Sequence, residues 1–82
     1  MVVFKNKYGQ YHREDGPAIE YADGHKEWFI NGLLHRIDGP AIEFKSGAKH
    51  WWILHFYFDK RPILKDIFIV FSLNKNKKRG FI

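Results

Sequence analysis

The stretch HREDGPAIEY, residues 12–21, returns 23 residues later as HRIDGPAIEF, residues 35–44, with eight of the ten positions identical. A period between about 20 and 50 residues is typical of repeat proteins, in which one supersecondary unit is copied and stacked. The repeated histidine, arginine and aspartate also suggest a chemical site that is used twice. The residues around the repeat therefore have to show whether it is a copied folding unit or a functional site that occurs twice.

The match extends beyond the quoted stretch on both sides. Residues 27–30, EWFI, align with residues 50–53, HWWI, and residues 8–11, YGQY, align with residues 31–34, NGLL. We therefore expect the N-terminal residues to belong to an earlier, truncated copy of the unit.

Turn residues assign the unit to β structure. Asp23-Gly24 and Asn31-Gly32 separate short runs of apolar, β-branched and aromatic residues. Asp-Gly and Asn-Gly in this setting predict β-hairpins, because a type I′ turn needs a positive φ at both central positions. Pro40 then falls at the start of a strand, where proline is tolerated. The sequence predicts an all-β fold, an antiparallel meander of repeated β-hairpins with a period of 23 residues.

The copying stops after Ile53. Leu54-His55 stands where the pattern gives Asn-Gly, and Phe58-Asp59 stands where it gives His-Arg. Within a single domain, 1–82, this predicts three segments: hairpin repeats at 8–55, a divergent C-terminal element at 56–73 and a basic tail at 74–82.

The apolar part of the divergent element, residues 63–73, admits two interpretations. Its β-branched and aromatic composition favours a strand. The spacing of its apolar residues also fits a short helix opened by Pro62. We prefer the strand and leave the short helix as the alternative.

Composition limits the chain to a small scaffold. A domain of this length buries only about 60% of its unfolded surface, and the chain has no cysteine for a disulfide or a thiolate zinc site. The runs at residues 28–30 and 51–58 are apolar at successive positions, so both faces of these strands favour burial. We expect the C-terminal element or a second copy to cover one face, and we favour a homo-oligomer, most simply a two-fold dimer.

The net charge of +5 is located mainly in the tail. Lys75, Lys77, Lys78 and Arg79 supply four positive charges, whereas residues 1–74 carry ten Lys and Arg against nine Asp and Glu. The sequence shows no secretory signal and no apolar run near the about 20 residues that cross a bilayer. We therefore expect no membrane association and a cytoplasmic location, which is the host cytoplasm if the protein is viral.

The repeated His-Arg-x-Asp also has two interpretations. In the structural one, which we favour, the aspartate caps the Asp-Gly-Pro turn, the arginine pairs with an acid on the next hairpin, and the histidine is a spacer, because every repeat must form the same turn. This assigns a structural role to His12, Asp15, Gly16, His35, Asp38 and Gly39. In the minority interpretation arginines and the tail bind anions such as phosphate, through Arg13, Arg36, Lys75, Lys77, Lys78 and Arg79.

Catalytic and metal chemistry find little support. Ser46 and Ser72 are the only serines, and no Gly-rich phosphate loop is present. Equivalent residues of successive hairpins lie two strand spacings apart, roughly 10 Å, so His12 and His35 are too far apart to share a zinc ion. We expect no catalytic residue, no metal, no cofactor and no enzymatic activity.

Large aromatic residues are the better candidates for recognition. Trp28 and Trp51 occupy the same repeat position, which favours packing, whereas Trp52 with Phe56 and Phe58 suggests interface anchors. The predicted protein-binding residues are Trp52, Phe56, Phe58, Trp28 and Trp51.

The order of short strand, Asp-Gly turn, tryptophan-bearing strand and Asn-Gly turn resembles the MORN-type repeat. The HRxDGPA block resembles the divergent form of this repeat in small bacterial and bacteriophage proteins, over residues 8–55. The resemblance implies a scaffold with a binding surface, and a phage or mobile-element protein that binds and inhibits a host (defence) protein. Two alternatives stay open: a phosphate-ligand sequestrant or nucleic-acid-binding module, and a structural component of a larger assembly.

Overall fold

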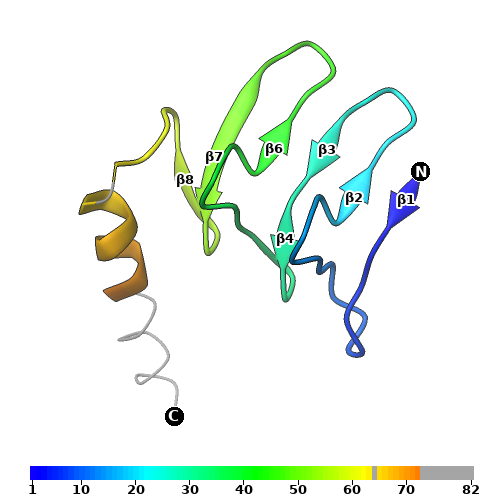
Figure 1. The fold of residues 1–82 in the computed structure, drawn as a ribbon, viewed down its shortest axis with the longest axis horizontal. Coiled ribbons are helices and arrows are strands. Elements are labelled where there is room, and N and C mark those ends of the chain that lie inside the picture. The colour runs from blue at the N-terminus through cyan, green and yellow to red at the C-terminus, as the bar shows by residue number, and fades with distance from the viewer. Residues whose placement is uncertain (64, 73–82) are drawn as a thin grey trace.

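The computed structural model describes residues 1–63 and 65–72 of the 82-residue chain. Strands neighbouring in the sheets pair antiparallel, in a six-stranded sheet of order β1-β2-β3-β6-β7-β8 and a two-stranded sheet β4-β5. Figure 1 shows successive hairpins side by side, which confirms the predicted all-β meander. The strands are β1 (Val2–Val3), β2 (Ile19–Glu20), β3 (Lys26–Glu27), β4 (Phe29–Ile30), β5 (Leu33–Leu34), β6 (Ile42–Glu43), β7 (Lys49–Ile53) and β8 (Phe56–Phe58).

The Asn31-Gly32 turn has the predicted backbone, whereas the turn at Asp23-Gly24 has a positive φ at its glycine only and is therefore not the predicted type I′ turn. Asn31 and Gly32, which join β4 to β5, have φ values of 47° and 80°, both in the left-handed region. Gly24, between β2 and β3, has a φ of 99°. Each of these turns therefore uses the residue type that tolerates a positive φ, so local sequence and hairpin geometry agree.

The last hairpin, β7–β8, forms without the Asn-Gly signal. Leu54 and His55 have φ values of 49° and 69°, so they reproduce the turn of Asn31-Gly32 with residues that disfavour it. The backbone N–H of Leu54 donates to Nδ1 of His35 at 2.9 Å. The N–H of His55 donates to the carbonyl oxygen of Leu34 at 2.8 Å. Tertiary hydrogen bonds thus stabilise this turn, and the hairpin runs to Phe58, three residues past the expected end of the repeats.

The strand register divides the side chains of the sheet between two faces. Directly opposed residues of an antiparallel pair point to the same face, and successive residues alternate. Lys26 pairs with Glu20 on one neighbouring strand and with Glu43 on the other, so these three side chains point to the same face. Ile19 pairs with Glu27, and these two side chains point to the opposite face. Charged residues of opposite sign therefore alternate along one face.

The core is small and the molecule is thin. The buried apolar side chains of the described residues are Ala18, Ile19, Leu34, Ala41, Ile53 and Val70. The shortest principal extent is 17 Å, against 39 and 32 Å for the other two. Within residues 1–63 and 65–72, the sheet is therefore covered by the long side chains of its own two faces and not by a second layer.

Residues 65–72 form a helix, so the preferred assignment of a strand was wrong. The N–H of Ile63 donates to the Asp66 carboxylate at 3.2 Å, and the N–H of Ile67 donates to the carbonyl oxygen of Ile63 at 3.1 Å. This is half of a capping box, which starts the helix directly after Pro62. The helix lies beside β8, at the opposite end of the sheet from β1 (Figure 1), and Val70 is its buried residue. No helix in the described part of the chain is long and apolar enough to cross a membrane.

Candidate functional site

The repeated histidine caps the turn of the next hairpin. The Nδ1 atom of His12 accepts a hydrogen bond from the N–H of Asn31 at 2.9 Å, and Nδ1 of His35 accepts one from the N–H of Leu54 at the same distance. The two donating residues, Asn31 and Leu54, occupy equivalent positions, the first of each two-residue turn. The histidine is therefore a connector between successive hairpins and not the spacer that the sequence predicted.

His35 serves this role as a neutral imidazole. Burial lowers the pKa of His35 below its ordinary value of 6.5, because a half-buried site disfavours the charged form. A neutral ring leaves Nδ1 free to accept the Leu54 N–H. The histidine of the second repeat is thus kept in the protonation state that the turn requires.

The repeated arginine closes its own loop. Nε of Arg13 donates to the Asp15 carboxylate at 3.0 Å, and Nη1 donates to the carbonyl oxygen of Pro17 at 3.3 Å. Arg36 repeats both contacts, with Asp38 at 3.1 Å and with the carbonyl oxygen of Pro40 at 3.1 Å.

Each guanidinium also joins the loop to the sheet. Nη1 of Arg36 pairs with Glu43 of β6 at 3.0 Å, and its Cζ lies 3.9 Å from the ring centroid of Trp28. Arg13 lies 4.2 Å from the Phe4 ring centroid in the equivalent position. The acid partner lies on a strand of the arginine's own unit, whereas the sequence predicted one on the next hairpin. These contacts favour the structural interpretation of the repeated arginines.

The glycine of HRxDGPA makes room for this arginine. A Cβ atom added to Gly39 would lie 2.7 Å from Cζ of Arg36, and one added to Gly16 would lie 2.9 Å from Cζ of Arg13. Neither glycine is among those with a positive φ. The glycine therefore leaves space for the guanidinium, and a Cβ at this position would displace the end of the arginine side chain.

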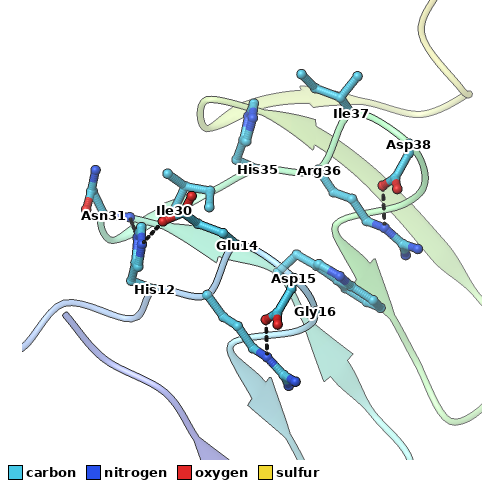
Figure 2. Close-up of a pocket in the computed structure, with 12 residues that line it drawn as sticks. His12, Glu14, Asp15, Gly16, Ile30, Asn31, His35, Arg36, Ile37 and Asp38 are labelled. Carbon is cyan, nitrogen blue, oxygen red and sulfur yellow. Dashed lines mark hydrogen bonds and ion pairs between the residues drawn. The ribbon is translucent and has the colours of Figure 1, made fainter.

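The two HRxD loops border an open groove of about 750 Å³, which Trp28, Ile30 and Asn31 also line. Figure 2 shows Ile30 and Asn31 between the two loops. The carboxylates of Asp15 and Asp38 are both 88% exposed at its rim, whereas the side chains of Arg13 and Arg36 are 27% and 23% exposed. The groove therefore presents carboxylates to solvent and keeps its paired guanidiniums inside. An anion would meet these carboxylates first, and we call this site the acidic groove.

A row of seven rings crosses one face of the sheet. Neighbouring centroids along the row are 4.8 to 5.4 Å apart, and the planes are tilted by 47° to 80°. Tilted and edge-to-face contacts in this range are favourable between rings. The rings follow the order Tyr21, His25, Phe44, His50, Tyr57, Trp52 and His55, and we call this surface the ring face.

The ring face is partly open to solvent. Tyr57 is 50% exposed and Tyr21 is 37% exposed, at opposite regions of the row. His25 is anchored by Glu27, whose carboxylate lies 2.7 Å from Nε2. Partial burial and the neighbouring Glu27 carboxylate raise the pKa of Tyr21, so its hydroxyl remains a hydrogen-bond donor at neutral pH.

The five predicted protein-binding aromatics are split between two faces. Trp52 is opposite Tyr57 and belongs to the ring face, whereas Trp51 is opposite Phe58 and points to the other side. Phe56, opposite Ile53, also lies on the Trp51 side, and Trp28 packs beneath the Arg36 guanidinium.

Sequence reasoning missed most of the ring face. Its histidines have no histidine at the equivalent repeat positions, so a comparison of the repeats does not indicate that they share one surface. The signal that could have found them is the register, because Tyr21 opposite His25 and His25 beside Phe44 follow from the paired strands. Pairing the hairpins residue by residue, outward from their turns, places these rings on one face of the sheet.

The described residues contain no group of three or more His, Cys, Asp or Glu side chains that could hold a metal ion. Of the predicted anion-binding residues, Lys75, Lys77, Lys78 and Arg79 lie outside the described residues.

The fold and these two surfaces define an open sheet of hairpin repeats with an aromatic face and a groove between its loops. Comparison of the chain with protein-family models, curated proteins and solved structures gave no match.

Proposed function

We propose that this chain is a non-enzymatic protein-binding module whose partner contacts the ring face. The observation that carries the proposal is the unbroken row of seven rings with Tyr21 and Tyr57 exposed. Aromatic side chains dominate binding energy at protein interfaces, because they bury a large area and need few rotamers fixed. A partner that covers these exposed edges gains apolar burial on a surface that is already ordered.

The tilt of the rings favours a protein partner over a stacked base or sugar. Neighbouring rings are tilted by about 50° or more along most of the row, so the row contains no flat platform of parallel rings. Stacking platforms for bases use exposed ring faces instead. Apolar and carbonyl groups of another protein can match the uneven aromatic surface and the hydroxyls of Tyr21 and Tyr57, two residues that are 37% and 50% exposed. The resemblance to phage and bacterial HRxDGPA proteins adds a host protein as the target and inhibition as the consequence.

The phosphate-binding alternative relies on the repeated arginines and the tail. Arg13 and Arg36 already pair with Asp15 and Asp38, whose carboxylates are the exposed groups of the acidic groove. A phosphate that binds there would have to displace a carboxylate from each guanidinium. This alternative therefore keeps only the tail as its support.

Affinity capture from a bacterial lysate, with and without nuclease treatment, tests the proposal. The immobilised wild-type chain should retain a partner at physiological salt, and Tyr57→Ser should lose most of it, because Tyr57 lies in the row and is half exposed. Tyr8→Ser is the matched control: Tyr8 is 76% exposed but lies outside the row. Loss of the partner on nuclease treatment would support the nucleic-acid alternative. Equal retention by wild type and Tyr57→Ser would overturn the ring-face proposal.

A further inference from the structure

The two copies of HRxDGPA differ at their third position, Glu14 in the first and Ile37 in the second. Both loops have the same internal geometry, since the arginine–aspartate distances are 3.0 and 3.1 Å. Glu14 is 84% exposed, as expected of a carboxylate on a loop, but Ile37 is 49% exposed. The first repeat shows that the loop folds with glutamate here. Folding alone therefore does not explain an exposed isoleucine.

Ile37 separates two grooves of opposite charge. On one side is the acidic groove, whose exposed carboxylates belong to Glu14, Asp15 and Asp38. Figure 2 shows Ile37 at its margin, pointing away from the Arg36 guanidinium. On the other side is a second groove of about 690 Å³ with Arg61 and Lys65 exposed along it.

The second groove is otherwise apolar. Ile37 itself, Pro62, Ile63 and Ile67 line it, and Ile63 is 63% exposed. We call it the basic groove. An apolar ridge thus lies between a negative rim and a positive rim on one continuous surface.

We propose that this surface binds a second copy of the chain, with a two-fold axis passing through Ile37. A two-fold axis that lies in the interface plane, perpendicular to the line joining the two grooves, places the acidic groove of one copy against the basic groove of the other, and the reverse. Ile37 and its mate then meet at the axis, where they remove exposed apolar area from water. Each copy supplies both halves of the charge complementarity, so the surface is complementary to itself.

The proposed dimer would also stabilise this thin molecule. The described residues bury six apolar side chains, and a chain with so small a core gains stability from association. The charges give the pair its orientation, since any register that superposes like grooves opposes carboxylates to carboxylates. The ring face does not contribute to this surface, so the dimer leaves it available for another partner.

Sedimentation equilibrium of the full chain tests the dimer. We expect the wild-type chain to be dimeric at about 100 µM, a concentration that populates even a modest interface. Ile37→Glu should weaken dimerisation at least about tenfold, because it removes the apolar centre and adds a charge beside its mate. Its fold should persist, since the first repeat carries glutamate at this position, and far-UV circular dichroism checks this. Val2→Lys, which removes another half-exposed apolar side chain at the far edge of the sheet, is the control that should dimerise normally.

A charge exchange tests the two-fold arrangement. The double variant Arg61→Glu, Lys65→Glu and the single variant Glu14→Lys should each dimerise more weakly than wild type at low salt. Mixed together they should associate more strongly than either variant does alone, because the new lysine faces the new glutamates and the other pair of grooves is unaltered. A wild-type chain that is monomeric at about 100 µM would overturn the proposal. So would a folded Ile37→Glu that dimerises like wild type, or a mixture that fails to recover association.

Discussion

Nδ1 of His35 accepts a hydrogen bond from the backbone N–H of Leu54, at a distance of 2.9 Å, across 19 residues of sequence. His12 makes the same bond to Asn31, at the same distance and the same separation. The first member of each pair opens an HRxDGPA loop, and the second opens the turn of the next hairpin. This bond joins consecutive hairpins, and it explains why the histidine is copied along with the rest of the unit.

Removing the acceptor should therefore destabilise the β7–β8 hairpin. His35→Ala leaves the Leu54 N–H without its protein partner, at a cost of about 1–3 kcal/mol in the free energy of unfolding. His35→Asn, whose side-chain oxygen can reach the same region, should recover part of this loss. Urea denaturation followed by tryptophan fluorescence measures both variants, and an alanine variant as stable as wild type would show that the bond contributes nothing.

The same histidine should make stability depend on pH. The pKa of His35 is lowered in the folded state by burial, so between the two pKa values the unfolded chain binds the extra proton. Its contribution to stability is thus fully present above about pH 6.5, the ordinary value for histidine. It is lost as the pH falls from there through the lower folded pKa. Unfolding free energies of wild type and His35→Gln, compared between pH 8 and pH 5, should converge on acidification. A constant difference would contradict this assignment.

Gly39 should be sensitive to substitution because of Arg36 and not because of its backbone. Gly39→Ala places a Cβ about where the guanidinium passes, 2.7 Å from Cζ, and should cost about 1–3 kcal/mol through the displaced arginine. In a chain that already carries Arg36→Ala, the same glycine substitution should cost much less. A double-mutant cycle by denaturation measures this coupling, and additive effects would place the cause elsewhere.

Leu54 should be a site where the chain can be stabilised. Its φ of 49° costs a leucine about 1–2 kcal/mol relative to a residue that accepts the left-handed region. Leu54→Asn restores the residue found at the equivalent turn position, Asn31, and should raise the unfolding free energy by about 0.5–1 kcal/mol. Asn31→Leu is the reciprocal variant and should lower it. Thermal unfolding followed by circular dichroism orders the three proteins.

The sequence was sufficient to predict the hairpins, because their turns are coded locally. Gly24, Asn31 and Gly32 adopt a positive φ at little cost, and each lies where the chain reverses direction. The same local reasoning gave no turn at Leu54-His55, where the geometry depends on His35 and Leu34 from the previous unit. A turn that is stabilised by distant partners leaves no local signal.

The C-terminal helix was misassigned for a related reason. Its β-branched and aromatic residues favour a strand on composition, but Asp66 accepts from the Ile63 N–H and starts a helix after Pro62. In the candidate sites, the pattern identified the repeated side chains but not their partners. The two copies differ at Ile37 and at the ring-face histidines. A search for identical residues in the two repeats therefore overlooks these positions.

We infer that the residues shared by the two HRxDGPA copies build the fold, and that the residues that differ between the copies provide recognition. The most direct test makes the two blocks identical, with Ile37→Glu and Phe44→Tyr together, so that residues 12–21 and 35–44 have one sequence. At a concentration where wild type is monomeric, both proteins should unfold cooperatively, with free energies equal within about 0.5 kcal/mol. At about 100 µM only wild type should dimerise. Loss of cooperative unfolding in the variant, or undiminished dimerisation, would contradict the account.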